Sequence, residues 1–224
     1  MRPLSYVLSP DGTPWCFVPP LYEGSSFDNF AVPGPDNPIA RRELTGVLLA
    51  VKAWLQDFPD QERPGLLLCG LPGTGKTHLA SAAFNKLIRD NVRGLFYDYQ
   101  DLAERLALGA RDGSGSVELD VCRSVDVLFL DDIGSQRPKD YMADATLSLL
   151  KFRCNHRRPL IATTSLSDPD TGHRNQGDNR LQIAYERTLG DVIGPSARSR
   201  LFEMCTIIKM PIVEDYRTKR SRTF

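Results

Sequence analysis

Short apolar runs alternate along the chain with longer segments whose apolar residues recur at helical spacing. The apolar runs predict five buried strands, at residues 65–69, 94–99, 126–132, 159–165 and 204–210. The segments with helical spacing predict helices, at residues 38–58, 76–88, 101–108, 140–156, 181–189 and 197–202. Strands that alternate with helices favour a mainly parallel sheet with helices on both faces. The pattern therefore predicts an α/β fold of three layers.

Local signals place the ends of the first helix and two of the loops. Asn37 followed by Pro38 is typical of a helix start, because Asn caps free backbone N–H groups and Pro suits the first helical position. Pro59 is expected to end this helix. Two polar segments that contain glycine, 109–116 and 167–180, are predicted to be loops.

Composition indicates one core domain with two flanking segments. The 224 residues are 41% hydrophobic and 25% charged, which is ordinary for a globular protein that buries a sizeable core. Residues 1–36 are rich in Pro, Gly and Ser and predict an extended arm laid on the domain. Residues 37–213 are expected to form the core domain, and residues 214–224 a basic tail.

Net charge, cysteine spacing and hydropathy give no support for nucleic-acid binding, a cysteine metal site or a membrane span. Lys and Arg together number 28, as do Asp and Glu, so net charge gives no argument for nucleic acid or membrane binding. The five cysteines are scattered and no two stand at metal-ligand spacing, which favours free thiols in a reducing compartment. The N-terminus lacks the apolar run of a signal peptide, and no stretch is as long as a membrane span. We therefore expect a cytoplasmic protein without a membrane partner.

The clearest chemical motif follows the first predicted strand of the sheet. The pattern of a glycine, four residues and Gly-Lys-Thr is formed by Gly70, Leu71, Pro72, Gly73, Thr74, Gly75, Lys76 and Thr77. Glycines allow backbone N–H groups to point inward at phosphate oxygens, and the helix that follows places its positive end beneath them. Lys76 is predicted to contact the β- and γ-phosphates of ATP, and the Thr77 hydroxyl to hold Mg²⁺.

Two acids at the end of a later strand supply the second half of such a site. Asp131 and Asp132 directly follow an apolar run, and a carboxylate at such a strand end holds Mg²⁺ directly or through water. We assign the metal to Asp131, and we assign to Asp132 the orientation or deprotonation of the attacking water. An apolar strand that ends in acids is weak evidence alone, but it is strong evidence when it follows the phosphate-binding motif.

Other polar residues are expected near the nucleotide, each with an open alternative. Thr163, Thr164 and Ser165 end a strand, where a hydroxyl is able to sense the γ-phosphate or polarise the water; the alternative is a cluster that caps a turn. In the arm, segment 25–30 places an aromatic ring near the nucleotide base, or its two phenylalanines, Phe27 and Phe30, simply anchor the arm.

Three arginines are candidates for contacts with nucleotide. Arg200 follows a loop that contains glycine and is placed to stabilise charge on the ATP of a neighbouring subunit, with Arg198 as a close competitor. Arg217 is placed to face the nucleotide of its own subunit. The alternative for each is a solvated or ion-paired arginine, which describes most arginines in proteins.

Taken together, these motifs resemble two closely similar groups of AAA+ proteins, the DnaC/DnaI-like helicase loaders and the IstB transposition ATPases. The resemblance runs over about residues 60–217 and rests on the segments 70–80, 128–134, 159–165, 199–205 and 215–217, together with Arg153. It implies a P-loop NTPase core with a five-stranded sheet, ATP with Mg²⁺, and no sizeable lid domain.

The resemblance also implies partners and residue roles. The implied partners are single-stranded DNA and a hexameric replicative helicase, or a transposase, with ATP-dependent self-association of the chain. It makes His78 part of the nucleotide-binding segment, Arg200 the arginine finger and Arg217 the second sensor. The family usually has Asn where this chain has Ser165, so either Thr164 replaces the sensor or turnover is slow. The proline-rich arm is too short for a helicase-binding domain, which favours a core-only relative or one with a separate adaptor.

Four functions follow from these observations. The first is an ATPase that acts in DNA replication as a helicase loader, and the second is a transposition helper. The third, a P-loop kinase of a small molecule, is disfavoured by the Asp131–Asp132 pair and by the hydroxyl-rich strand end. The fourth is a nucleotide-dependent binding module with weak hydrolysis, which the serine at position 165 makes reasonable.

Overall fold

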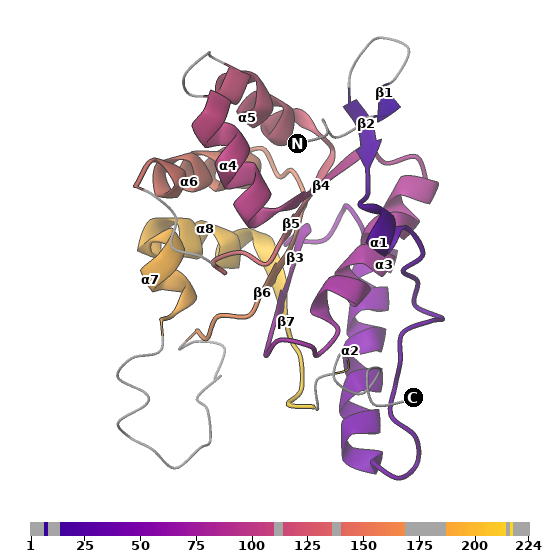
Figure 1. The fold of residues 1–224 in the computed structure, drawn as a ribbon. Helices are drawn as coiled ribbons and strands as arrows, with labels where there is room; N and C mark the ends of the chain where they lie inside the picture. The colour runs from indigo at the N-terminus through magenta and orange to yellow at the C-terminus, as the bar shows by residue number, and fades with distance from the viewer. Residues whose placement is uncertain are drawn as a thin grey trace.

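Five parallel strands form the centre of the computed structural model, which describes residues 7–8, 14–109, 114–135, 140–168, 187–213 and 216. In chain order the five are β3 (Gly65–Cys69), β4 (Gly94–Asp98), β5 (Val127–Asp131), β6 (Leu160–Thr164) and β7 (Cys205–Lys209). Their order across the sheet is β4-β5-β6-β3-β7, with every neighbouring pair parallel (Figure 1). The predicted α/β fold with a five-stranded parallel sheet is therefore confirmed.

The N-terminal region adds two short strands to one edge of this sheet. Strand β2 (Pro14–Phe17) pairs in parallel with β4, and β1 (Val7–Leu8) pairs with β2 in the antiparallel direction. The composition of this region predicted an extended arm and no strand. An edge strand presents unpaired backbone N–H and C=O groups, and β2 satisfies those of β4 at this edge. The short helix α1 (Pro20–Glu23) follows.

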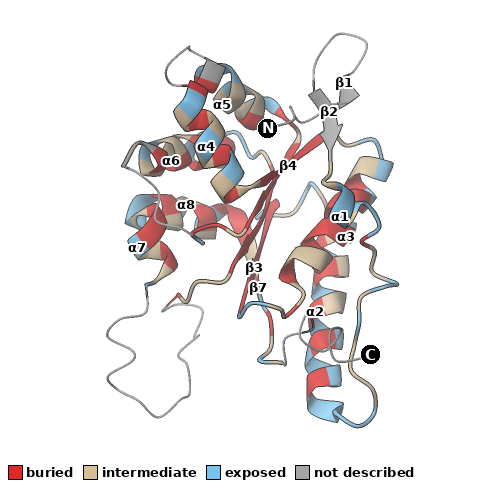
Figure 2. Ribbon diagram, in the orientation of Figure 1, coloured by how far each residue is buried: buried red, intermediate tan, exposed pale blue. Residues whose placement is uncertain are grey.

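Helices cover both faces of the sheet, as predicted. One face carries α1, α2 (Pro38–Gln56) and α3 (Lys76–Arg89). On the other face, the described residues form α4 (Tyr99–Gly109), α5 (Ser114–Ser124), α6 (Asp140–Asn155), α7 (Leu189–Ile193) and α8 (Pro195–Met204). Figure 2 shows the central parallel strands buried between the two layers. Side chains alternate along each strand, so that Leu66 and Leu68 join one core and Leu67 the other.

Helix α2 begins as its sequence predicts. The side chain of Asn37 accepts a hydrogen bond from the backbone N–H of Ala40 at 3.2 Å, and Pro38 occupies the first turn. The buried side of the helix includes Leu44, Val51 and Trp54. The indole N–H of Trp54 donates to the carbonyl of Gly65 at 3.1 Å, which fixes α2 against the start of β3.

Besides α1, which lies in the predicted arm, helices α5 and α7 differ from the prediction. Helix α5 begins at Ser114, inside the segment predicted to be a loop, and it is held to the sheet by a 2.6 Å hydrogen bond from the Tyr97 hydroxyl to Glu118. Helix α7 spans Leu189–Ile193 rather than 181–189; residues 181–186 lie outside the described residues. A capping box between Thr188 and Asp191 starts α7, so Thr188 cannot continue a preceding helix.

No helix in the described parts of the chain is both long enough and apolar enough to cross a bilayer.

Candidate nucleotide-binding site

The predicted phosphate-binding motif forms a loop between strand β3 and helix α3. Gly75 has φ of 93° and lies directly before the first helical residue, Lys76. A Cβ atom on Gly75 would lie 2.7 Å from Cε2 of Phe30, so both the backbone angle and the close contact require glycine. The first N–H groups of α3 have no partner within the helix, and they lie at the end where an anion is bound most favourably.

The Lys76 side chain is folded into this loop. Its ammonium donates to the carbonyls of Gly70 and Leu71 at 2.8 and 2.9 Å, and the residue is only 6% exposed. The Thr74 hydroxyl also donates to Leu71, at 2.8 Å. A cation held among carbonyls at a helix N-terminus is a suitable partner for phosphate oxygens, because the loop already fixes its position.

Asp131 joins the two halves of the predicted site. Its Oδ1 atom accepts hydrogen bonds from the Thr77 hydroxyl at 2.9 Å and from the Thr163 hydroxyl at 2.6 Å. Burial raises the pKa of Asp131, and these two hydrogen bonds oppose that rise. The strand end of β5 therefore lies beside the start of α3, and a hydroxyl and a carboxylate suitable for Mg²⁺ are in contact.

A third carboxylate lies on the neighbouring strand at the same edge of the sheet. Asp98 ends β4 opposite Asp131, and its pKa is also raised by burial. No group of three His, Cys, Asp or Glu within the described residues is arranged to hold a metal by itself. Mg²⁺ commonly takes one or two carboxylates and completes its shell with phosphates and water, and the donors at this strand edge fit that pattern.

Asp132 is held by the strand beside it. Its φ is 55°, which is unusual for a residue other than glycine, and its N–H donates to the Thr163 hydroxyl at 2.8 Å. The Ser165 hydroxyl lies 3.5 Å from Oδ1 of Asp132. Asp132 and Ser165, each a separate candidate from the sequence, therefore lie side by side.

Thr164 fits the turn-capping alternative, whereas Thr163, one of the three hydroxyls expected at this strand end but given no separate role, contacts the two acids. The Thr164 hydroxyl donates to the carbonyl of Ile133 at 2.8 Å and accepts from the N–H of Leu166, so it caps a turn on the other face of β6. Successive strand residues point to opposite faces, which puts Thr163 and Ser165 on the side of the acids. Alternation along the predicted strand implies that Thr163 and Ser165 share a face, but it does not tell which face carries the acids.

A sequence profile of the IstB-like ATP binding protein family matches residues 51–185, which is more than half of the chain of 224 residues. The chain belongs to this family. The predicted membership of the AAA+ helicase loader and IstB-like group is thereby confirmed, and the family is one of ATP-binding proteins.

Individual relatives agree with the family assignment. The replicative helicase loader DnaC of Escherichia coli (strain K12) is 27% identical over 147 residues, which are 63% of this chain and 56% of that protein. A crystal structure of the DnaC helicase loader has a TM-score of 0.68 and 25% identity, covering 86% of this chain and 100% of that one. AMPPCP-bound DnaA from Aquifex aeolicus shares the fold, with a TM-score of 0.63, 21% identity, and coverage of 92% and 55%. The chain spans about half the length of the curated relatives it matches.

The N-terminal segment of this IstB-like chain lies against the glycine loop. His78 on α3 is 3.0 Å from the carbonyl of Ser26, and its ring lies 5.8 Å from that of Phe30. Phe27 lies 5.5 Å from the ammonium of Lys52. Phe30 is therefore next to the predicted phosphate site, whereas Phe27 contacts α2. The His78 side chain therefore contacts the N-terminal segment at Ser26 and Phe30, in addition to lying near the glycine loop.

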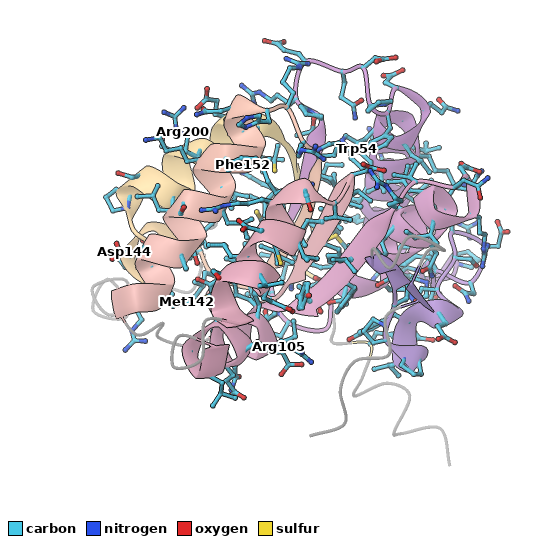
Figure 3. All side chains as sticks on the ribbon, turned by 90° about the horizontal axis from the view of Figure 1, so that it is seen from above. Trp54, Arg105, Met142, Asp144, Phe152 and Arg200 are labelled. Carbon is cyan, nitrogen blue, oxygen red and sulfur yellow. The ribbon has the colours of Figure 1, made fainter. Side chains whose placement is uncertain are left out.

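The candidate arginines of the IstB-like chain occupy different surroundings. Arg198 on α8 forms two 2.6 Å hydrogen bonds to Asp168, whereas Arg200 is partly exposed and pairs with Glu203 at 2.7 Å. Figure 3 shows Arg200 on the helical layer across the sheet from Trp54. Arg217 lies outside the described residues. The preceding residue, Tyr216, donates its N–H to the carbonyl of Gly73 at 3.1 Å and so lies at the glycine loop.

Replacing Thr163 by Val should lower both stability and ATP turnover. Val has nearly the same shape, but the N–H of Asp132 and the carboxylate of Asp131 each lose a buried hydrogen bond. We expect a loss of about 1–3 kcal/mol in the free energy of unfolding. Thr163→Ser keeps the hydroxyl and is the matched control. Urea unfolding and phosphate release would be measured on both; equal behaviour of the Val and Ser variants would contradict the assigned role.

Proposed function

We propose that this protein binds ATP with Mg²⁺, hydrolyses it, and acts as a loader of a hexameric replicative helicase. The observation that carries the proposal is the contact of Thr77 with Asp131, backed by Thr163 on the next strand. This contact unites a phosphate-binding loop with a buried carboxylate at the strand edge where ligands of parallel sheets bind.

The phosphates of ATP are bound by the loop and the start of α3. Backbone N–H groups between Gly70 and Thr77 donate to phosphate oxygens, and the Lys76 ammonium exchanges its two carbonyl partners for the β- and γ-phosphates. Thr77 and Asp131 are the residues that hold Mg²⁺. The metal, when bound, neutralises the charge that develops on the phosphates.

Hydrolysis is assigned to the residues beyond the strand ends. Asp132 is held by Thr163 with its carboxylate toward Ser165, and it orients a water molecule for attack on the γ-phosphate and accepts its proton. Ser165 contacts that carboxylate and senses the γ-phosphate with its hydroxyl. A hydroxyl reaches less far than the amide that the family usually has at this position, so we expect slow turnover.

Assembly completes the site in this proposal. Arg200 is available at the surface of α8, and it stabilises the transferring phosphoryl group in the site of the next subunit. The similarity to E. coli DnaC, a replicative helicase loader, supports the helicase as partner, and single-stranded DNA is the second proposed partner. The family profile, which describes an IstB-like protein, favours a second candidate, a helper ATPase for a transposase.

One experiment separates the two candidates. The protein is mixed with a hexameric replicative helicase or with a transposase from the same source, with ATP or without nucleotide, and each mixture is passed over a size-exclusion column. A helicase complex that forms only with ATP is the expected result. Phosphate release is then measured with and without single-stranded DNA. An ATP-dependent complex with the transposase alone would overturn the loader assignment.

The role of Arg200 is tested by mixing two inactive variants. Arg200→Ala lacks the arginine for its neighbour, and Lys76→Ala lacks the phosphate lysine, so each alone should lose about 10³-fold or more in turnover. Mixed assemblies should recover activity, because a Lys76→Ala subunit supplies Arg200 to an intact site.

Arg89→Ala, at an exposed arginine that ends α3, is the matched control and should retain full activity. If Arg200→Ala hydrolyses ATP like the wild type, or if mixing restores nothing, Arg200 does not act across subunits.

A further inference from the structure

Asp131 and Asp168 are the two buried carboxylates among the described residues, and the second of them lies outside the candidate nucleotide site. Asp168 is 2% exposed and receives two hydrogen bonds of 2.6 Å from the guanidinium of Arg198, one from Nε and one from an Nη atom. The same guanidinium lies 4.2 Å from the ring centre of Phe202. The pair thus links the segment after β6 to helix α8.

Geometry and burial make this link stiff. Paired hydrogen bonds between a guanidinium and a carboxylate fix both the distance and the plane of the two groups. Separating them would leave a charge buried without its partner, which is strongly unfavourable. The Phe202 ring limits the remaining rotation of Arg198. A shift of the segment that carries Asp168 is therefore expected to move α8 with it.

The segment that carries Asp168 begins at the candidate nucleotide site. Ser165 lies three residues earlier and contacts Asp132. Between them, Leu166 packs against Gly134 in the loop after β5, and the carbonyl of Ser167 accepts a 3.0 Å hydrogen bond from the N–H of Leu189 in α7. The residues from 165 to 168 are thus held at every step, by the β5 loop at one end and by α7 and α8 at the other.

The other end of the link lies near the arginine proposed to act on a neighbouring subunit. Arg200 is two residues beyond Arg198 on α8 and has a partly exposed side chain. The two arginines that the sequence left as competitors therefore differ in their partners, since Arg198 pairs with the buried Asp168 and Arg200 with the exposed Glu203.

We propose that Asp168 and Arg198 are positioning residues that tie helix α8 to the sensor end of β6, so that the γ-phosphate state of one site sets how Arg200 is presented to the next subunit. The proposal rests on the proposed ATPase function. It gives Asp168 no contact with nucleotide, and it predicts an effect on the neighbour's site rather than on the subunit's own.

The test is Asp168→Asn, which keeps the shape of the side chain and removes its charge. We expect the dissociation constant for ATP, measured with a fluorescent analogue, to stay within about twofold of the wild type, and turnover to fall about tenfold or more. Mixing with the inactive variant Asp132→Asn should restore turnover, because its subunits still bind ATP and retain the ion pair and Arg200. A residue needed only for stability, or only in its own site, would not be complemented in this way.

Asp126→Asn is the matched control. Asp126 forms a comparable pair with Arg93, at 2.9 and 2.7 Å, but at the opposite edge of the sheet, and its replacement should leave turnover unchanged. If Asp168→Asn does not fold, Arg198→Lys replaces it, since it keeps the charge but not the paired geometry. The same pattern of intact binding, reduced turnover and rescue by mixing is expected.

The outcomes are distinct. Unchanged or raised turnover in Asp168→Asn and Arg198→Lys would overturn the inference, as would reduced turnover without rescue by Asp132→Asn subunits. A wild-type protein without ATP hydrolysis would overturn both this inference and the proposed function. If the wild type hydrolyses ATP but Asp168→Asn does not behave as expected, this inference is overturned and the proposed function is not.

Discussion

Lys76→Ala is expected to abolish ATP binding and turnover. The Lys76 ammonium is buried in the glycine loop and held by the carbonyls of Gly70 and Leu71, so it is already positioned where the phosphates are proposed to bind. Its removal leaves the loop without a charge to balance the β- and γ-phosphates. We expect affinity for an ATP analogue to fall about 100-fold or more, which corresponds to about 2.7 kcal/mol.

Lys86→Ala is the control for this prediction. Lys86 lies on the same helix, is about half exposed and pairs with Asp90 four residues later, a kind of surface pair that contributes little. Both variants are titrated with a fluorescent ATP analogue and assayed for phosphate release. Equal nucleotide affinity in Lys76→Ala and in wild type would show that the glycine loop is not the phosphate site.

Asp131→Asn should give the second large effect, with opposite signs for activity and stability. Activity should fall about 100-fold or more, because a neutral amide is a poor replacement for a carboxylate on Mg²⁺. Stability without nucleotide should rise, because burial raises the pKa of Asp131 in the folded protein. A carboxyl whose pKa is raised by folding is less stable as a charged group in the folded protein than in the unfolded chain. Its ionisation therefore lowers the free energy of unfolding at pH values above its unfolded pKa, and protonation at lower pH removes this loss.

The measurements for Asp131→Asn are thermal unfolding without nucleotide and phosphate release with Mg²⁺. A gain of about 1 kcal/mol would raise the midpoint by about 2–4 °C in a domain of this size. Asp126→Asn is the opposite case, because the nearby Arg93 lowers the pKa of Asp126. Its charge stabilises the fold at neutral pH, and that contribution is lost as pH falls through its folded pKa. A fall in the unfolding midpoint of Asp131→Asn would show that burial does not make the ionised Asp131 carboxylate destabilising.

Because of Thr163, the carboxyl end of β6 contributes as much to the geometry of the proposed site as the glycine loop does. One hydroxyl donates to the Asp131 carboxylate and accepts from the N–H of Asp132, so a single residue of β6 sets the geometry of both acids. The sensor position, Ser165, lies two residues farther on the same face of the strand. The chemistry of the proposed site is therefore built by three adjacent parallel strands, β3, β6 and β5, and not by the loop alone.

The features that could be predicted from the sequence are those encoded locally. Apolar runs and helical spacing identified the five central strands and most of the helices. The glycine loop was predictable because positive φ values and close backbone contacts, as at Gly75, favour glycine whatever surrounds them. Asp131 and Asp132 were identified because parallel strands end at one edge of the sheet, so order along the chain implies proximity in space.

The features that could not be predicted are pairings between distant residues. Nothing in residues 14–17 distinguishes an edge strand from an extended arm, because the partner groups belong to β4. The order β4-β5-β6-β3-β7 brings Thr163 to Asp131, while the neighbouring Thr164 turns to the other face. Likewise, only the packed structure joins Asp168 to Arg198 across 30 residues.

The sequence by itself thus determined the family, the parallel α/β core and the two motifs proposed to bind Mg²⁺-ATP, because strand, helix and glycine-loop signals act over a few neighbouring residues. Only the tertiary structure decided which hydroxyl of β6 faces the acids and which arginine of α8 pairs with the buried Asp168. The physical reason is that hydrogen bonds and ion pairs between distant segments depend on side-chain direction and burial, which no local pattern of residues records.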